Sequence, residues 1–148
     1  MSSEATVPFE ITLHVRDCCL CLHVQRAARA LARRFDEALR PLELTNGQFS
    51  LMMSLNRPEP PAITAVANLL AMDRTTLTAA LKPLERRGLV KVTPDRLDRR
   101  SRRLILTSQG KTLLAAAVPI WEETHRDVES QLKDSDPDRL RSSLLALS

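Results

Sequence analysis

Glycine is rare in this sequence, and its scarcity bears directly on function. The 148 residues include three glycines and no tyrosine, and aromatic residues make up 3%. No glycine-rich loop is present to hold a phosphate, and neither a His-Glu-x-x-His motif nor a Ser/His/Asp set in a recognisable context occurs. We therefore expect no catalytic residues, no enzyme activity and no cofactor.

Long hydrophobic stretches are also missing. No residue from Pro60 to Met72 is charged, but these 13 residues include two prolines. They fall short of the roughly 20 apolar residues that cross a bilayer. The N-terminal segment MSSEATVPFE lacks the basic and apolar regions of a secretion signal. The sequence therefore predicts a cytoplasmic protein that does not enter a membrane.

Cysteine is scarce too, and its three copies, Cys18, Cys19 and Cys21, lie together. An odd, clustered set is not the disulfide framework of a secreted domain. Three interpretations fit: small buried side chains, thiolates near a helix start that sense oxidants, or ligands of a soft metal together with His14 or His23. Structural packing is the favoured interpretation and redox sensing the functional alternative, and no metal site is predicted.

What the sequence has in quantity is leucine, alanine and charge. Apolar residues make up 43% and charged residues 27%, as in an ordinary globular protein. Leucine and alanine favour helices, and a chain of this length can bury a proper core as one domain. The composition predicts a mainly α protein.

The first third of the chain has the pattern of two helices. Apolar residues recur at spacings of three and four and predict a long helix between Leu20 and Pro41. A second helix is predicted after Thr45, because Thr45 and Gln48 have the spacing of a capping box. The segment RPEPP, residues 57–61, then forces an extended connection.

Two short helices with almost no connection between them are predicted next. Thr64 is a candidate cap of the first helix and Asp73 of the second, which ends near Gly88. Pro83 lies inside the second helix and should kink it or end it early. Two short helices joined by a tight turn, here at residues 71–72, are typical of a helix-turn-helix.

The apolar pattern then changes to the alternation of strands. LVKVT (89–93) and LILT (104–107) predict a β-hairpin whose long tip is charged. Thr107 or Ser108 begins another long helix, and DSDPD (134–138) begins a last one. The order of elements predicts a mainly α (α+β) fold, a winged helix-turn-helix with further helices before and after it.

Positive charge is concentrated in the middle of the chain. The net charge is +4, but residues 74–103 contain ten Lys or Arg and three acidic residues, or +7, whereas the rest of the chain carries −3. This asymmetry predicts a polyanionic partner, double-stranded DNA before a membrane surface. The alternative, a winged domain that only contacts proteins and binds no DNA, has no need of five arginines within residues 96–103.

The second helix of the pair has a face suited to the major groove of DNA. With Leu77, Leu81 and Leu84 directed inward, a turn of about 100° per residue places small, hydroxyl-bearing and basic residues outward. The predicted DNA-binding residues of this helix are Arg74, Thr75, Thr76, Thr78 and Lys82.

The hairpin tip, or wing, is predicted to reach the DNA backbone or minor groove. Its predicted DNA-binding residues are Arg96, Asp98, Arg99, Arg100 and Arg102.

The chain resembles the MarR (multiple antibiotic resistance regulator) family of dimeric bacterial transcription factors. The matching stretches are LTNGQFSLMMSL (44–55), LLAMDRTTLTAALKPLERRGLVKVTPD (69–95) and DRRSRRLILTSQG (98–110). The resemblance implies one unit over residues 18–148. Within it we expect the winged helix-turn-helix at about residues 45–107, dimerisation helices at about 18–40 and 108–148, and before it an arm over residues 1–17 that is partly disordered or contacts the dimer partner.

The resemblance also implies a function. We expect a homodimer that binds a pseudo-palindromic operator, as a repressor relieved by a small molecule or an oxidant. In the family's wing an aspartate braces an arginine that enters the minor groove, and Asp98 and Arg100 occupy those positions, with Arg99 the nearest competitor. The tyrosine partners of peroxide-sensing relatives are absent. The apolar faces of the first and last helices, which a small winged domain cannot cover, favour dimerisation independently. The residues do not identify the operator sequence or the effector, and they do not distinguish a repressor from an activator.

Overall fold

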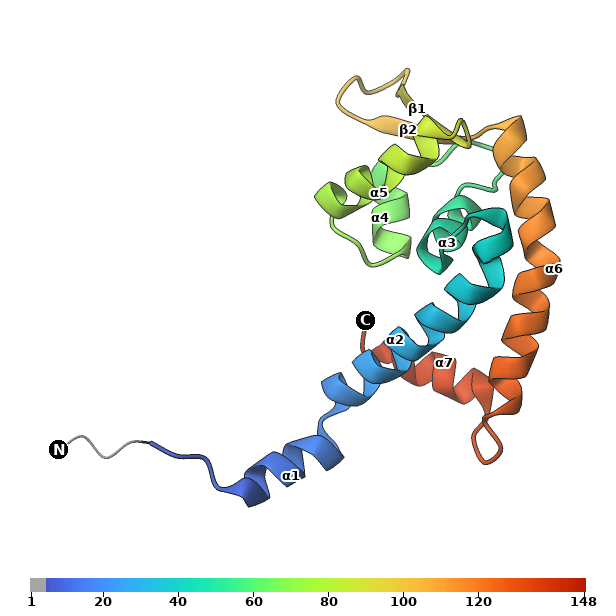
Figure 1. Ribbon diagram of the computed structural model, residues 1–148. Helices are drawn as coiled ribbons and strands as arrows, with labels where there is room; N and C mark the ends of the chain where they lie inside the picture. Colours follow the sequence, from blue (N-terminus) through green and yellow to red (C-terminus); the bar gives the residue numbers. More distant parts are fainter. Residues whose placement is uncertain (1–4) are drawn as a thin grey trace. The chain divides into compact units, whose positions relative to one another are not determined.

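The computed structural model describes residues 5–148, which form helices and one two-stranded sheet (Figure 1). Contacts within the chain define a first unit that ends at Arg34 and a second unit, Phe35–Ser148. The elements in chain order are α1 (Phe9–Cys18), α2 (Leu20–Leu39), the 3-10 turn η1 (Arg40–Leu42), α3 (Asn46–Ser54), α4 (Ile63–Leu69), α5 (Arg74–Arg86), β1 (Val90–Pro94), β2 (Arg102–Leu106), α6 (Ser108–Ser130) and α7 (Pro137–Ala146). The predicted mainly α fold with a small sheet is confirmed. None of the described helices is long and apolar enough to span a bilayer.

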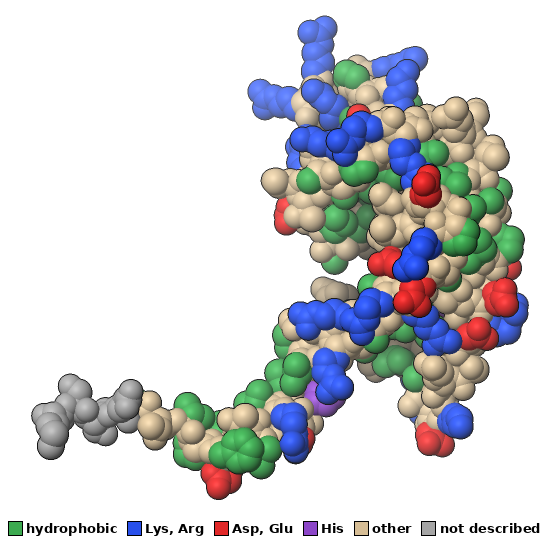
Figure 2. Space-filling view, in the orientation of Figure 1, with side chains coloured by type: hydrophobic (Ala, Val, Ile, Leu, Met, Phe, Trp, Pro, Cys, Tyr) green, Lys and Arg blue, Asp and Glu red, His purple; other side chains and the backbone are tan. Residues whose placement is uncertain are grey.

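The first unit contains α1 and most of α2. The backbone of Cys19 is extended (φ −69°, ψ 110°) and separates the two helices. The predicted N-terminal arm therefore contains a helix that the sequence pattern did not reveal, and its first four residues lie outside the described part of the chain. None of residues 5–34 is buried. Phe9 and Leu20 are 68% and 67% exposed, and hydrophobic side chains are visible on the surface of α1 (Figure 2).

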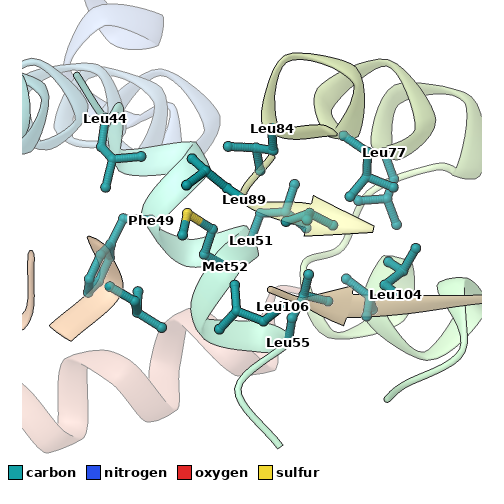
Figure 3. Close-up of a cluster of buried hydrophobic side chains, with 14 of the residues drawn as sticks. Leu44, Phe49, Leu51, Met52, Leu55, Leu77, Leu84, Leu89, Leu104 and Leu106 are labelled. Carbon is teal, nitrogen blue, oxygen red and sulfur yellow. The ribbon is translucent and has the colours of Figure 1, made fainter. Parts of the chain in front are cut away.

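The hydrophobic core lies in the second unit, where α3, α4, α5, α6 and the sheet pack together (Figure 3). Met52 of α3, Leu77 and Leu84 of α5 and Leu104 of β2 are fully buried. Burial of one such side chain contributes about 1.5–3 kcal/mol. The core therefore holds α5 and the hairpin on a common support.

Side-chain caps begin most of the helices of this unit, as predicted. Thr45 and Gln48 form a capping box, in which each side chain accepts a 3.1 Å hydrogen bond from the other residue's backbone N–H. The Thr107 hydroxyl accepts from the backbone N of Gly110 at 3.0 Å and begins α6. Asp136 caps α7, and Pro137 occupies its first turn. These local signals are confirmed because each depends on residues within one turn.

The predicted cap Thr64 is wrong, since α4 begins at Ile63 and its N-cap residue is Ala62, which makes no side-chain hydrogen bond. Ile63 is buried in the core, and Ala62 forms an isolated antiparallel bridge with Arg103. Tertiary packing and strand pairing, rather than a capping hydroxyl, therefore determine where α4 begins.

The expected early end of α5 at Pro83 is also wrong, because the helix continues to Arg86. Leu81 and Leu84 on either side of the proline are buried, and the backbone N of Arg87 donates to the carbonyl oxygen of Pro83 at 3.1 Å. Burial of these leucines offsets the backbone donor that the proline lacks. The helix ends at Arg86, with Arg87 as its C-cap residue. Gly88 follows, and its φ of 71° is the left-handed conformation expected of a glycine just after a helix.

The hairpin is antiparallel, with Val90 opposite Leu106 and Pro94 opposite Arg102. The second strand begins at Arg102, two residues before the predicted start. The wing loop is therefore residues 95–101, and Arg102 and Arg103 belong to the strand.

Candidate nucleic-acid interface

Helix α5 exposes one face along its length. Leu77, Leu81 and Leu84 are 0%, 2% and 0% exposed and face the core. The exposed residues of α5 are Arg74, Thr75, Thr76, Thr78, Ala79, Lys82, Glu85 and Arg86. All five residues predicted to bind DNA from this helix thus lie on its open side, as the helical period requires.

The start of α5 is held by Asp73. One carboxylate oxygen accepts from the backbone N of Thr76 at 2.7 Å, and the other accepts the Thr76 hydroxyl at 2.8 Å. The backbone hydrogen bond first, and the hydroxyl second, hold the pKa of Asp73 below its ordinary value because both favour the ionised carboxylate. This cap fixes the first turn of the helix, where Arg74 and Thr75 lie.

The three threonines of this face differ in what their hydroxyls contact. Thr76 donates to Asp73, and Thr78 donates to the carbonyl oxygen of Arg74 at 2.8 Å. Thr75 makes no side-chain hydrogen bond with the other described residues, and it is exposed. Thr75 is therefore the hydroxyl of this helix that is available as both donor and acceptor.

The wing loop is shaped by two aspartates that contact its backbone. Asp98 accepts from the backbone N of Arg100 at 3.0 Å, and Asp95 accepts from that of Leu97 at 3.1 Å. The resemblance implied that Asp98 braces the side chain of Arg100, but the ion pairs among the described residues do not include this pair. The short Asp98 side chain instead closes a turn with the N–H two residues on.

The arginines of the hairpin divide into held and free side chains. Arg102 folds back, and its Nη1 donates to the carbonyl oxygens of Arg99 and Ser101 at 3.1 and 3.3 Å. Arg103, absent from the predicted site, pairs with Asp95 at 3.0 Å. No spacing in the sequence signals this pair, because it depends on the register of the two strands.

Three exposed wing arginines have guanidinium groups without a partner among the described residues: Arg96, Arg99 and Arg100. Lys and Arg side chains gather over the hairpin end of the second unit in Figure 2. Guanidinium groups stay charged and match phosphate geometry. The wing and the open face of α5 thus present positive charge and a free hydroxyl from adjacent elements, since α5 packs on β1.

The three cysteines lie in the first unit as free thiols, with Cys18 and Cys21 exposed and Cys19 half-buried. The Sγ of Cys21 accepts from Gln25 Nε2 at 3.3 Å, and the Sγ of Cys19 lies 3.5 Å from the backbone N of Leu22. The favoured interpretation, packing in a core, is not what this chain shows for Cys18 and Cys21. Within residues 5–148 no group of three His, Cys, Asp or Glu residues is arranged to hold a metal ion.

A cavity of about 550 Å³ opens between α3, α4 and α6. Its lining includes Phe49, Met53, Leu69, Val118, Trp121 and Glu122. The Trp121 ring stacks on Phe49, with ring centres 6.1 Å apart, and on His125 at 4.6 Å. The cavity has the size of a small-molecule site, about 300–1,000 Å³, and aromatic and aliphatic groups form most of its wall. Sequence patterns gave no signal for it, since three separate helices contribute.

Comparisons with known proteins show similarity to transcriptional regulators. Residues 44–101 match the model of the MarR family. The transcriptional regulator HosA of Escherichia coli O111:H- is 33% identical over 96 residues, which are 64% of this chain and 70% of HosA. The transcriptional regulator PecS of Dickeya dadantii is 27% identical over 124 residues, 82% of this chain and 75% of PecS. A crystal structure of the M. tuberculosis transcriptional regulator MosR with DNA is similar with a TM-score of 0.80 and 35% identity, over 88% of this chain and 93% of that one.

Proposed function

The chain belongs to the MarR family of winged helix-turn-helix transcriptional regulators, and we propose that it represses transcription as a homodimer on a pseudo-palindromic operator. The observation that carries the proposal is the surface formed by α5 and the wing. There the open face of α5, with its Thr75 hydroxyl, adjoins Arg96, Arg99 and Arg100 of the wing, and these side chains have no partner among the described residues. The proposed location is the cytoplasm.

Each element of this surface has a role that follows from its chemistry. Helix α5 enters the major groove, where Thr75 faces base edges and Arg74, at the helix start, meets phosphate. Lys82, farther along α5, contacts the phosphate backbone of the DNA. The wing follows the neighbouring minor groove, whose negative potential attracts Arg99 and Arg100. The similar M. tuberculosis regulator MosR was solved in complex with DNA, which supports DNA as the partner of this fold.

Dimerisation is supported by apolar residues that the chain leaves uncovered. In α7, Leu144 and Leu145 are 43% and 74% exposed, and in the first unit Phe9 and Leu20 are more than half exposed. Large apolar side chains left exposed on a helix favour a partner that covers them. A second copy would cover these helices and place two α5 helices about 34–36 Å apart, one turn of DNA.

Relief of repression is proposed to come from a small molecule in the cavity between α3, α4 and α6. A flat, largely apolar molecule fits the stacked rings of Phe49 and Trp121. Oxidation of Cys18, Cys19 or Cys21 is the second candidate signal, because two of these thiols are exposed.

The test is DNA selection followed by a salt titration. Duplexes bound by the full chain would be selected from a random pool, and affinity would be measured against salt concentration. We expect a palindromic consensus, a dimer in sedimentation, and a linear fall of log affinity with log salt, by about 0.9 for each phosphate neutralised. A chain that stays monomeric and binds no duplex at low salt would favour the protein-binding alternative.

A further inference from the structure

The guanidinium of Arg103 joins the wing to the chain that precedes the helix-turn-helix. Its Nε donates to Asp95 Oδ2 at 3.1 Å, and its Nη2 lies 3.0 Å from the same oxygen. Its Nη1 donates to the carbonyl oxygen of Pro60 at 3.2 Å. Asp95 directly follows β1, Arg103 lies in β2, and Pro60 lies in the connection before α4. One side chain therefore links three segments.

The other hydrogen bonds of the wing loop close within the wing. The backbone N of Asp95 donates to the Ser101 carbonyl, and that of Ser101 donates to the Asp98 carbonyl. The two carboxylates accept from backbone groups two residues on. In the described chain, none of these bonds reaches the helices of the second unit. Arg103 thus supplies the side-chain attachment of the loop to the rest of this unit.

Asp95 is an unexpected residue beside a DNA-binding surface. Its side chain is 12% exposed, against 39% for Arg103. A carboxylate repels the phosphates of an approaching duplex. The hydrogen bond from the backbone of Leu97 first, and then the charge of Arg103, hold the pKa of Asp95 below its ordinary value, so this carboxylate is ionised at neutral pH. Because the ionised carboxylate repels DNA, a role for Asp95 in DNA binding cannot be a direct contact with phosphate.

We infer that Asp95 and Arg103 form a brace that positions the wing for DNA. The inference rests on the proposed DNA binding and adds two positioning residues to it. The brace holds the wing loop relative to the start of α4, and thereby relative to α5, before DNA arrives. A loop that is already ordered loses less conformational freedom on binding. Asp95 therefore increases affinity without a DNA contact of its own.

Asp95→Asn distinguishes a positioning role from a charge effect, because the two predict opposite changes in DNA affinity. By charge alone, loss of a carboxylate would strengthen DNA binding, whereas loss of the brace weakens it. We expect roughly a three- to tenfold loss of affinity for the selected operator duplex. Glu59→Gln is the matched control, because Glu59 lines the same surface groove and has no side-chain hydrogen bond or ion pair with the other described residues. It should leave binding unchanged or slightly tighter.

Arg103→Lys tests the other half of the brace. Lysine keeps the charge but loses the planar fork that bonds Asp95 and Pro60 together. A direct phosphate contact would survive this change, whereas the brace predicts a loss similar to that of Asp95→Asn. The double variant should lose no more than either single variant, since each breaks the same link. The salt slope should stay at the wild-type value, because no phosphate contact is removed.

Amide hydrogen exchange of the free protein gives a readout that needs no DNA. Residues 96–101 should exchange faster in Asp95→Asn and in Arg103→Lys but not in Glu59→Gln, while α5 keeps its protection. The inference is overturned if the wing exchanges at the wild-type rate in both Asp95→Asn and Arg103→Lys. It is also overturned if both variants bind DNA as tightly as Glu59→Gln does. A wild-type chain that binds no DNA overturns the proposed function instead, and the exchange measurement distinguishes the two failures.

Discussion

A β-carbon placed on Gly110 would lie 2.2 Å from the carbonyl oxygen of Leu89. Gly110 lies in the first turn of α6 and Leu89 just before β1, so the long helix and the hairpin meet backbone to backbone here. Thr107 reinforces the junction, because its backbone N donates to Leu89 at 3.1 Å and its hydroxyl accepts from Gly110 at 3.0 Å. The position of the wing on the core therefore depends on the absence of a side chain at residue 110.

Gly110→Ala should lower the free energy of unfolding by about 1–3 kcal/mol, as overpacking does. The obstructing atom belongs to the backbone of Leu89 and cannot rotate away, so α6 and β1 must separate. Urea denaturation measures the change. Gly47→Ala is the control, because its added carbon would lie no closer than 4.0 Å to the Thr45 hydroxyl. Equal losses for the two alanine variants would contradict the account.

Thr75→Val should change which operator bases are preferred. Valine keeps the shape of the side chain but removes the hydroxyl that is free to contact a base edge, and the loss at the contacted base should be about 1 kcal/mol, the value of one hydrogen bond. Affinities for a panel of single-base operator variants measure it. Thr78→Val is the control, since that hydroxyl already donates to Arg74. If both variants altered the preference equally, the distinction between free and engaged hydroxyls would fail.

Arg100→Ala should weaken DNA binding and leave the melting temperature unchanged. The side chain is exposed and has no partner among residues 5–148, so its removal leaves no buried group of those residues without a partner. If Arg100 neutralises a phosphate, the slope of log affinity against log salt should become shallower by about 0.9. Arg126→Ala removes the same charge from an exposed position of α6 and should change neither quantity. A large fall in melting temperature for Arg100→Ala would show that the wing tip supports the fold.

Local patterns in the sequence predicted the helices of the second unit well. Thr45, Asp73 and Thr107 act as caps, and Leu77 and Leu84 face the core, because these features depend on residues within one or two turns. The errors have tertiary causes. Ala62 pairs with a strand distant in the sequence and displaces the expected cap, and burial of Leu84 carries α5 past its proline.

The sequence predicted which residues form the candidate site, but it did not predict the hydrogen bonds and ion pairs that these residues make. Charge and the helical period place Thr75 and Arg100 on open surface, but neither indicates which hydroxyl is engaged or which arginine is held. The predicted site does not include Arg103, and the pairing of Arg103 with Asp95 depends on the register of the hairpin. A shift of one residue in register would turn its side chain to the other face of the sheet, and spacing in the sequence does not determine that register.

Asp36→Asn should make the stability of the protein less dependent on pH in the acid range. Asp36 Oδ1 accepts from the backbone N of Asn46 at 2.7 Å and from its side-chain amide at 2.9 Å, and so joins the end of α2 to the start of α3. These bonds, the backbone one first, lower the pKa of Asp36 in the folded state. A lowered pKa means that the carboxylate stabilises the fold above the unfolded value, about 3.9 for Asp, and that this contribution is lost as pH falls through the folded value.

Urea denaturation between neutral pH and about pH 3 measures this contribution, since that range passes below the ordinary Asp pKa of about 3.9. At neutral pH, Asp36→Asn should lower the free energy of unfolding by about 1 kcal/mol, a value reduced for the partial exposure of the group. The difference from wild type should shrink as the wild-type carboxylate becomes protonated. Glu37→Gln, at the next and exposed position of α2, should show neither effect. A difference between Asp36→Asn and wild type that stays constant over the whole pH range would mean that the ionised carboxylate does not stabilise the junction of α2 and α3.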